Sequence, residues 1–411
     1  MRASRALFAC LLLLPVLACQ AEDAAPAPKP AERSTAAPGM DESLREVALA
    51  LVETRERALR DGDREAFLAT VDPDELGFSA TQARWFDNLA LLPVGDVSYE
   101  LGDEAVMSQV AGDGDLQLPV DFTMRLRGFD KRPVTQRMVW TFVRSGEDAL
   151  LANDRNIQID AKTGWTPAPW DLAHIDVRRS DGILAIFDDE TIDHADYVMS
   201  DLADATELVG DHLPDWSRRF VAYGTSDVTA IDKMSPMTVD DTAGVAFPVL
   251  SREGGPVAAY RFVLNPTVVR DVVSRGLVFR HELVHVALGT TDDRSPVWLV
   301  EGAAEYVART TFAVDDRRRI AAQRLGATPA IALEPSSRFY TRDPDVNYNL
   351  AALVCDYVAT TRGEDVLWDL VRAFRTTRFS TWAEAEDVVR RELGLSTREL
   401  SAQALAWARS A

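Results

Sequence analysis

Apolar residues recur with a helical period at the start of the folded part of the chain. Between 41 and 62 they fall three or four positions apart, and Gly62 ends the run, which predicts an amphipathic helix. The apolar positions are Leu44, Val47, Ala48, Leu51 and Val52. A short second helix is predicted after Asp63, and Ser79 with Gln82 resembles a capping box that opens a third helix.

The pattern then changes to a period of two, which is typical of strands. Residues 97–101 and 116–126 alternate between apolar and polar, and 138–142 repeat the alternation after a turn near 128–133. Helices followed by an antiparallel meander with one apolar face predict a helix-wrapped sheet, so residues 41–172 form one α+β unit.

A second unit is predicted over residues 173–411. It opens with strand patterns and a helical stretch over 192–209, and helical patterns from 363 onward close its back. The predicted strands are 175–177, 183–187, 219–223 and 260–264. An extended peptide could pair along 260–264 if that strand lies at a sheet edge, although its alternation fits an interior strand equally well.

One predicted helix carries the residues with the clearest chemistry. Apolar residues from Thr267 to Leu288 support a helix, with Gly289 at its end, and this helix contains the sequence His281-Glu282-Leu283-Val284-His285. Two histidines four residues apart project from one helical face and can bind one metal ion. Glu282 lies about 100° further around the axis, where it can reach a metal-bound water without binding the metal.

A second helix follows the polar loop 290–296 and begins near Val297, with Glu301 and Glu305 on one face. A catalytic zinc needs a third ligand from a neighbouring element and a fourth position open to water. The two helices therefore predict a zinc site with hydrolytic chemistry.

Together these motifs resemble the gluzincin metallopeptidases, and most of all the group called peptidase MA-like. Their signature is HExxH followed by a helix with W-L-x-E-G-x-A-E, which stands here at 298–305. The resemblance implies one Zn²⁺ per chain, bound by His281, His285 and Glu301, with Glu305 contacting a ligand histidine. The glycine-methionine-glutamate-asparagine element with which aminopeptidases of this clan hold a free amine is absent, which argues against aminopeptidase activity.

The resemblance also implies a tyrosine that stabilises the oxyanion of the tetrahedral intermediate. Tyr348 stands at the head of a predicted helix and is the first candidate, with Tyr340 as the alternative. Either tyrosine fits equally well as a buried side chain that hydrogen-bonds a carbonyl.

The N-terminal residues read as an export signal. Arg2 and Arg5 precede an apolar run over 7–18, which predicts a signal peptide over 1–18. Cys19 resembles the acylated cysteine of bacterial lipoproteins, and residues 19–40 read as a lipidated, disordered tether. The expected location is the outer face of the bacterial cell membrane, or secretion if Cys19 is not acylated.

The net charge of the chain excludes one class of binding partner. The formal net charge is −21, which opposes binding to nucleic acid.

The order of elements in 41–172 resembles NTF2-like or cystatin-like folds, and the absence of a catalytic pattern there favours a spacer or docking domain. His174, His194 and His212 lack ligand spacing and are expected at the surface or in packing, whereas Cys355 is expected in the core.

The sequence as a whole predicts an extracytoplasmic zinc metallopeptidase that hydrolyses peptide bonds, with Glu282 as general base and peptides or proteins as substrates. One alternative is a catalytically silent zinc-binding lipoprotein that serves as a scaffold. Another is ligand binding by the N-terminal unit, with the metal-binding unit as its effector.

Overall fold

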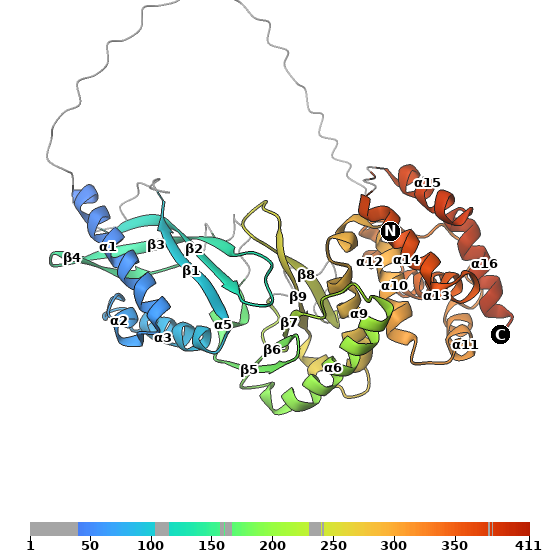
Figure 1. Cartoon of the computed structure of the whole chain (residues 1–411), viewed down its shortest axis with the longest axis horizontal. Coiled ribbons are helices and arrows are strands. Elements are labelled where there is room, and N and C mark those ends of the chain that lie inside the picture. Colours follow the sequence, from blue (N-terminus) through green and yellow to red (C-terminus); the bar gives the residue numbers. More distant parts are fainter. Residues whose placement is uncertain are drawn as a thin grey trace, which may run out of the picture.

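The computed structural model of the chain is a mixed α+β protein, in agreement with the predicted class (Figure 1). It describes residues 40–102, 115–156, 160, 167–229, 240, 242–376, 379 and 381–411. The predicted signal peptide, Cys19 and the tether up to residue 39 lie outside the described residues. Among the described helices, none has the length and apolar character needed to cross a membrane.

The N-terminal unit consists of helices around an antiparallel sheet with strand order β1-β2-β3-β4. Its described elements are α1 (Met40–Asp61), α2 (Arg64–Leu68), α3 (Leu76–Ala90), β1 (Val94–Leu101), β2 (Leu116–Leu126), β3 (Val134–Ser145), β4 (Asp148–Asn153) and α5 (Pro169–Leu172). Helices α1 to α3 and strands β1 to β3 confirm the predicted order, while β4 was not anticipated.

The predicted capping box at Ser79 and Gln82 is wrong, because α3 already begins at Leu76. Gln82 is buried and is used for tertiary contacts: its Nε2 donates to Asp154 Oδ2 at 2.7 Å, and its Oε1 accepts from Arg55. A glutamine with two buried partners is not available to cap a helix.

The C-terminal unit holds a mixed sheet with strand order β5-β6-β7-β9-β8 and a large set of helices. Its strands are β5 (Ile175–Ser180), β6 (Ile183–Asp188), β7 (Phe220–Tyr223), β8 (Gly244–Leu250) and β9 (Val257–Leu264). Its helices before the metal-binding motif are η1 (Ile192–His194), α6 (Ala195–His212) and α8 (Pro266–Arg270). From the motif onward they are α9 (Arg275–Leu288), η3 (Gly289–Arg294), α10 (Val297–Arg309), α11 (Val314–Leu325), α12 (Arg338–Thr341), α13 (Pro344–Arg362), α14 (Glu364–Thr376), α15 (Trp382–Leu393) and α16 (Thr397–Arg409).

Strand β6 joins the two units because both of its faces are buried. Ile183, Ala185 and Phe187 belong to the core shared with the C-terminal helices. Leu184 and Ile186 belong to a core shared with the N-terminal sheet. Alternate side chains of a strand point to opposite faces, so the second sheet lies between the N-terminal sheet and the helices, as Figure 1 shows.

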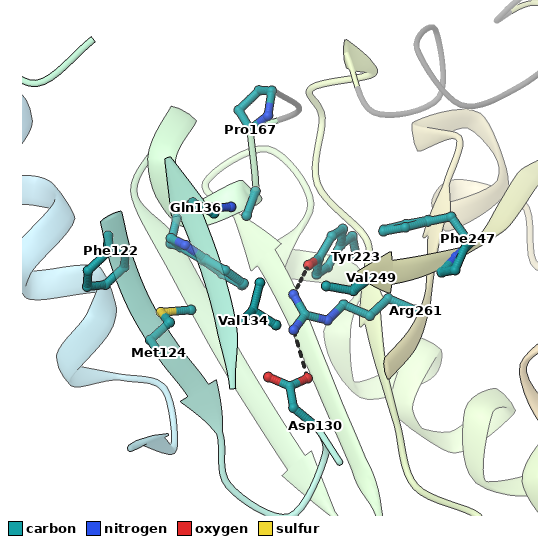
Figure 2. Close-up of a pocket in the computed structure, with 13 residues that line it drawn as sticks. Phe122, Met124, Asp130, Val134, Gln136, Pro167, Tyr223, Phe247, Val249 and Arg261 are labelled. Carbon is teal, nitrogen blue, oxygen red and sulfur yellow. Dashed lines mark hydrogen bonds and ion pairs between the residues drawn. The ribbon is translucent and has the colours of Figure 1, made fainter. Parts of the chain in front are cut away.

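A buried ion pair fastens the two units together (Figure 2). Arg261 on β9 donates from Nη2 to Asp130 Oδ1 at 2.8 Å and from Nη1 to the Tyr223 hydroxyl at 2.8 Å. Asp130 comes from the loop after β2, and its other oxygen accepts from the backbone N–H of Leu126 at 2.7 Å. Every charged atom of the Asp130 carboxylate therefore has a partner, as a buried charge requires.

The helix predicted over Thr267 to Leu288 is interrupted, so the prediction of one continuous helix is wrong. Helix α8 ends at Arg270, and α9 begins at Arg275. The carboxylate of Asp271 accepts from the backbone N–H of Val273 and from the hydroxyl of Ser274, and these contacts compete with continuation of the helix. Val272 and Val273 are exposed here, so these apolar residues do not belong to the buried face of a helix.

The strand 260–264 is interior, since β9 pairs with β7 on one side and with β8 on the other. The possibility that it forms the substrate-binding edge is therefore wrong. Strand β8, which was not anticipated from the sequence, occupies that edge of the sheet in the described part of the chain.

Gly302 is required for close packing of α10 against α13. A Cβ at this position would lie 2.6 Å from the Ala351 carbonyl oxygen and 2.7 Å from the Sγ of Cys355, which is buried as expected. We expect Gly302→Ala to destabilise the protein by about 1–3 kcal/mol through overpacking. Gly77→Ala in α3 is the matched control, because nothing lies within 4 Å of its Cβ.

Denaturant unfolding of both variants checks this prediction. The control should gain up to about 1 kcal/mol from the higher helix propensity of alanine. Equal stability of the two variants would contradict the close approach of α10 and α13.

Candidate metal centre

Helices α9 and α10 bring the three predicted ligands to one point. His281 Nε2 lies 3.2 Å from His285 Nε2 and 3.2 Å from Glu301 Oε2, and His285 Nε2 lies 3.6 Å from the same oxygen. Histidines four residues apart on α9 share a face, and α10 packs its own buried face, including Glu301, against it. Among the described residues, these three form a group whose ligand atoms can contact one metal ion, with His285 and Glu301 buried and His281 partly buried.

The outer nitrogen of each histidine faces a carboxylate. His281 Nδ1 lies 3.4 Å from Glu305 Oε1, and His285 Nδ1 lies 2.8 Å from Asp292 Oδ1. Glu305 also forms an ion pair with Arg309. The Asp292 carboxylate holds the proton on Nδ1 of His285 and leaves its Nε2 available as a metal ligand, whereas Glu305 lies near Nδ1 of His281 as an ion-pair partner.

Asp292 is a site residue that sequence reasoning missed. It was assigned only to the polar loop after the first helix, whereas η3 folds back and places it on His285. An acidic residue seven positions after the second histidine was the available signal, but loop geometry decides whether such a residue turns toward the helix.

The surrounding carboxylates favour positive charge at the centre. Burial lowers the pKa of His281, but Glu301 and Glu305 outweigh this effect and raise the pKa to about 10. The pKa of His285 is likewise raised, against the effect of burial, by Asp292 and Glu301. Burial raises the pKa of Glu301, yet the two histidines hold it well below its usual range.

One oxygen of Glu301 has no hydrogen-bond donor although it is buried. Oε1 accepts from the Tyr340 hydroxyl at 2.7 Å, whereas Oε2, the atom that faces both histidines, has none. Buried carboxylate oxygens are nearly always satisfied, so Oε2 is an orphaned acceptor aimed at the centre of the group.

Glu282 lies beside the three ligands and is held by strand β8. It is buried, it lines the same cleft, and its carboxylate accepts from the backbone N–H of Ala246. Gly244 leaves room for it, because a Cβ there would lie 3.1 Å from Glu282 Oε1. Burial raises the pKa of Glu282 from its ordinary value.

Both candidate tyrosines lie at the centre, but their contacts differ. Tyr340 on α12 is committed to Glu301 through its hydroxyl. Tyr348 on α13 packs its ring against His281, with centroids 6.4 Å apart, and lines the cleft. Burial, followed by the charge of Glu301, raises the pKa of each hydroxyl, so both stay protonated and able to donate.

A cleft of about 930 Å³ opens over the metal-binding group. Helices α9, α10 and α13 form its walls, and Gly244, Val245 and Ala246 of β8 line its rim. This volume lies at the upper end of ordinary ligand sites, so the cleft accommodates an extended chain of several residues.

The remaining histidines lie elsewhere. His174, with Asp176 and Asp189, forms another group of possible ligands, but His174 and Asp189 are exposed, and exposed acidic groups of this kind are common without a metal. His212 is partly buried, pairs with Glu364 and packs on Tyr306, as expected of a packing residue.

No protein-family model matches the chain, and no curated protein matches it in sequence.

The contact between Asp292 and His285 leads to a prediction about metal affinity. We expect Asp292→Asn to weaken zinc binding about 10- to 100-fold, because the amide supports the His285 tautomer less well than a carboxylate. Competition with a chromogenic chelator measures the affinity. Asp293→Asn is the control, since its side chain contacts Tyr260 instead, and an equal loss in both variants would contradict a specific role for Asp292.

Proposed function

We propose that this protein is a zinc-dependent metallopeptidase of the gluzincin type that hydrolyses peptide bonds. The observation that carries the proposal is the convergence of His281 Nε2, His285 Nε2 and Glu301 Oε2 beside the buried carboxylate of Glu282. The resemblance of 281–285 and 298–305 to the peptidase MA-like signature supports the same interpretation.

The donor set fits zinc. Two imidazole nitrogens and one carboxylate oxygen are a known ligand set for catalytic zinc, with bonds of about 2.0–2.2 Å. Tetrahedral bonds of that length place neighbouring ligand atoms roughly 3.3 Å apart. The three distances here are 3.2, 3.2 and 3.6 Å, and the orphaned Oε2 of Glu301 would be satisfied by the ion.

Each protein group then has a chemical task. Zinc, when bound, supplies a Lewis acid that polarises a carbonyl and lowers the pKa of water. Glu282 accepts the proton of the attacking water and passes it to the leaving amine, and its burial keeps the carboxylate basic enough for this work. Tyr348 donates its hydroxyl proton toward the developing oxyanion, while Tyr340 holds Glu301 in place.

The position of strand β8 favours a peptide as the substrate. It lies at the sheet edge, and its first residues line the cleft beside Glu282. An extended peptide can add to such an edge through backbone hydrogen bonds, which position the scissile bond without requiring a particular side chain.

We further propose that the enzyme acts outside the cytoplasm, tethered through a lipidated Cys19, and that its N-terminal unit is an NTF2-like spacer or docking domain.

Substituting each tyrosine by phenylalanine distinguishes the roles of Tyr348 and Tyr340. We expect Tyr348→Phe to lower kcat about 10²- to 10³-fold with little change in zinc affinity, because it removes only the oxyanion donor. Tyr340→Phe is expected to weaken zinc binding instead, since Glu301 loses its partner at 2.7 Å. Steady-state kinetics and chelator competition measure the two effects, and the reverse pattern would exchange the assigned roles.

Zinc content and cleavage of a mixed peptide library, read by mass spectrometry, test the proposal as a whole. One zinc per chain together with cleavage that stops on chelation supports a peptidase. Stoichiometric zinc without any cleavage would instead favour a catalytically silent scaffold.

A further inference from the structure

A second cavity lies between the two sheets, on residues separate from those of the metal cleft (Figure 2). Its volume is about 130 Å³, and its lining comes from both units. We call it the interdomain cavity. An engineered protein cavity of about 150 Å³ holds a benzene molecule, so this space is close to the size of a single aromatic ring.

The walls are mostly aromatic and aliphatic. They belong to β2, β3, α5, β7 and β8, and the large apolar side chains among them are Phe122, Met124, Trp170 and Phe247. Flat aromatic faces and a flexible methionine suit a planar ligand, and they offer no bond to a charged one.

Arg261 lines this cavity and carries one N–H group without an acceptor. Its guanidinium carries five N–H groups, of which Asp130 and Tyr223 accept two. The residue is only 4% exposed, and its Nε has no hydrogen-bond acceptor. Burying an N–H group without an acceptor costs free energy. The ion pair between the two units does not use the Nε–H group of Arg261.

The charge of Arg261 is already balanced. Asp130 forms a buried ion pair with it at 2.8 Å, so a second anion would meet the carboxylate as well as the guanidinium. A neutral oxygen acceptor satisfies the Nε–H group without introducing an unpaired buried charge.

We propose that the interdomain cavity is a binding site for a small uncharged aromatic molecule bearing a carbonyl or hydroxyl oxygen, which accepts a hydrogen bond from Arg261. The proposal concerns binding alone and does not depend on the metallopeptidase function.

Strand β8 connects this cavity to the metal cleft. Phe247 and Val249 line the interdomain cavity, whereas Gly244 to Ala246 line the cleft. The backbone N–H of Ala246 donates to Glu282. A ligand packed against Phe247 therefore acts on the strand that holds Glu282, and its binding changes the environment of the Ala246 amide.

Three probes of nearly equal shape test the site on the full chain. Acetophenone carries a neutral acceptor, cumene has none, and benzoate is an anion. Titrations followed by backbone amide NMR should give acetophenone an affinity at least about tenfold higher than that of cumene, because a hydrogen bond from a charged donor is lost. Benzoate should bind more weakly than acetophenone, and the Phe247, Val249 and Ala246 amides should shift.

Val134→Phe fills the cavity and should abolish acetophenone binding, whereas Val143→Phe, on the same strand but away from the lining, should retain it. Val249→Phe, on the opposite wall, serves if Val134→Phe does not fold. Absence of acetophenone binding to the wild type, or its retention in the filled variant, would overturn the site. Cumene binding as tightly would overturn the hydrogen bond to Arg261, and tighter binding of benzoate would overturn the uncharged class.

Discussion

Replacing Glu282 by glutamine is expected to lower kcat for peptide hydrolysis by about 10²- to 10⁴-fold, which is the usual contribution of a general base. Glutamine keeps the size of the side chain and can still accept from the backbone N–H of Ala246, but it cannot take a proton from water. Glu282 does not belong to the three-residue ligand group, so the variant should retain its zinc.

The measurement is therefore twofold: initial rates on a cleaved peptide, and zinc content by elemental analysis. Glu207→Gln on α6 provides the matched control, because this glutamate is exposed and lies outside the cleft. Unchanged turnover in Glu282→Gln would exclude the proposed mechanism. Loss of zinc along with activity would show instead that Glu282 supports the ligands.

Adding zinc to chelator-treated protein is expected to raise the free energy of unfolding by about 4 kcal/mol when zinc is present at roughly a thousandfold excess over its Kd. The gain arises because His281, His285 and Glu301 are assembled only in the folded state. His285→Ala should remove it, since two ligands from separate helices hold an ion far less well than three. Thermal unfolding with and without zinc provides the measurement.

His174→Ala distinguishes the buried ligand group from the exposed group around His174. This variant should keep the full zinc-dependent stabilisation. If stabilisation is instead lost in His174→Ala and kept in His285→Ala, the assigned metal centre is the wrong one.

The grouping of the candidate ligands could be predicted from the sequence because much of their geometry is local. A spacing of four residues on a helix fixes the relative direction of His281 and His285, and the same holds for Glu301 and Glu305. Periodicity likewise predicted most helices and strands, since one buried face repeats along each element. Only the choice of Glu301 as the third ligand was taken from resemblance, and the structure places its Oε2 beside both histidines.

Two polar side chains made contacts that the sequence pattern did not predict. Gln82 looked like a cap but is bonded to Arg55 and Asp154 inside the N-terminal unit. Asp271 interrupts the predicted helix by accepting from its own neighbours, although the valines around it fit a helical period.

The sequence by itself determined the amphipathic elements, the α+β class and the candidate ligands, because these depend on residues within a few turns of one another. Tertiary structure alone decided that β8 forms the edge beside Glu282, that Asp292 reaches His285, and that Arg261 meets Asp130 across the two units. Such contacts depend on how separate elements pack, and no period along the chain records which surfaces will meet.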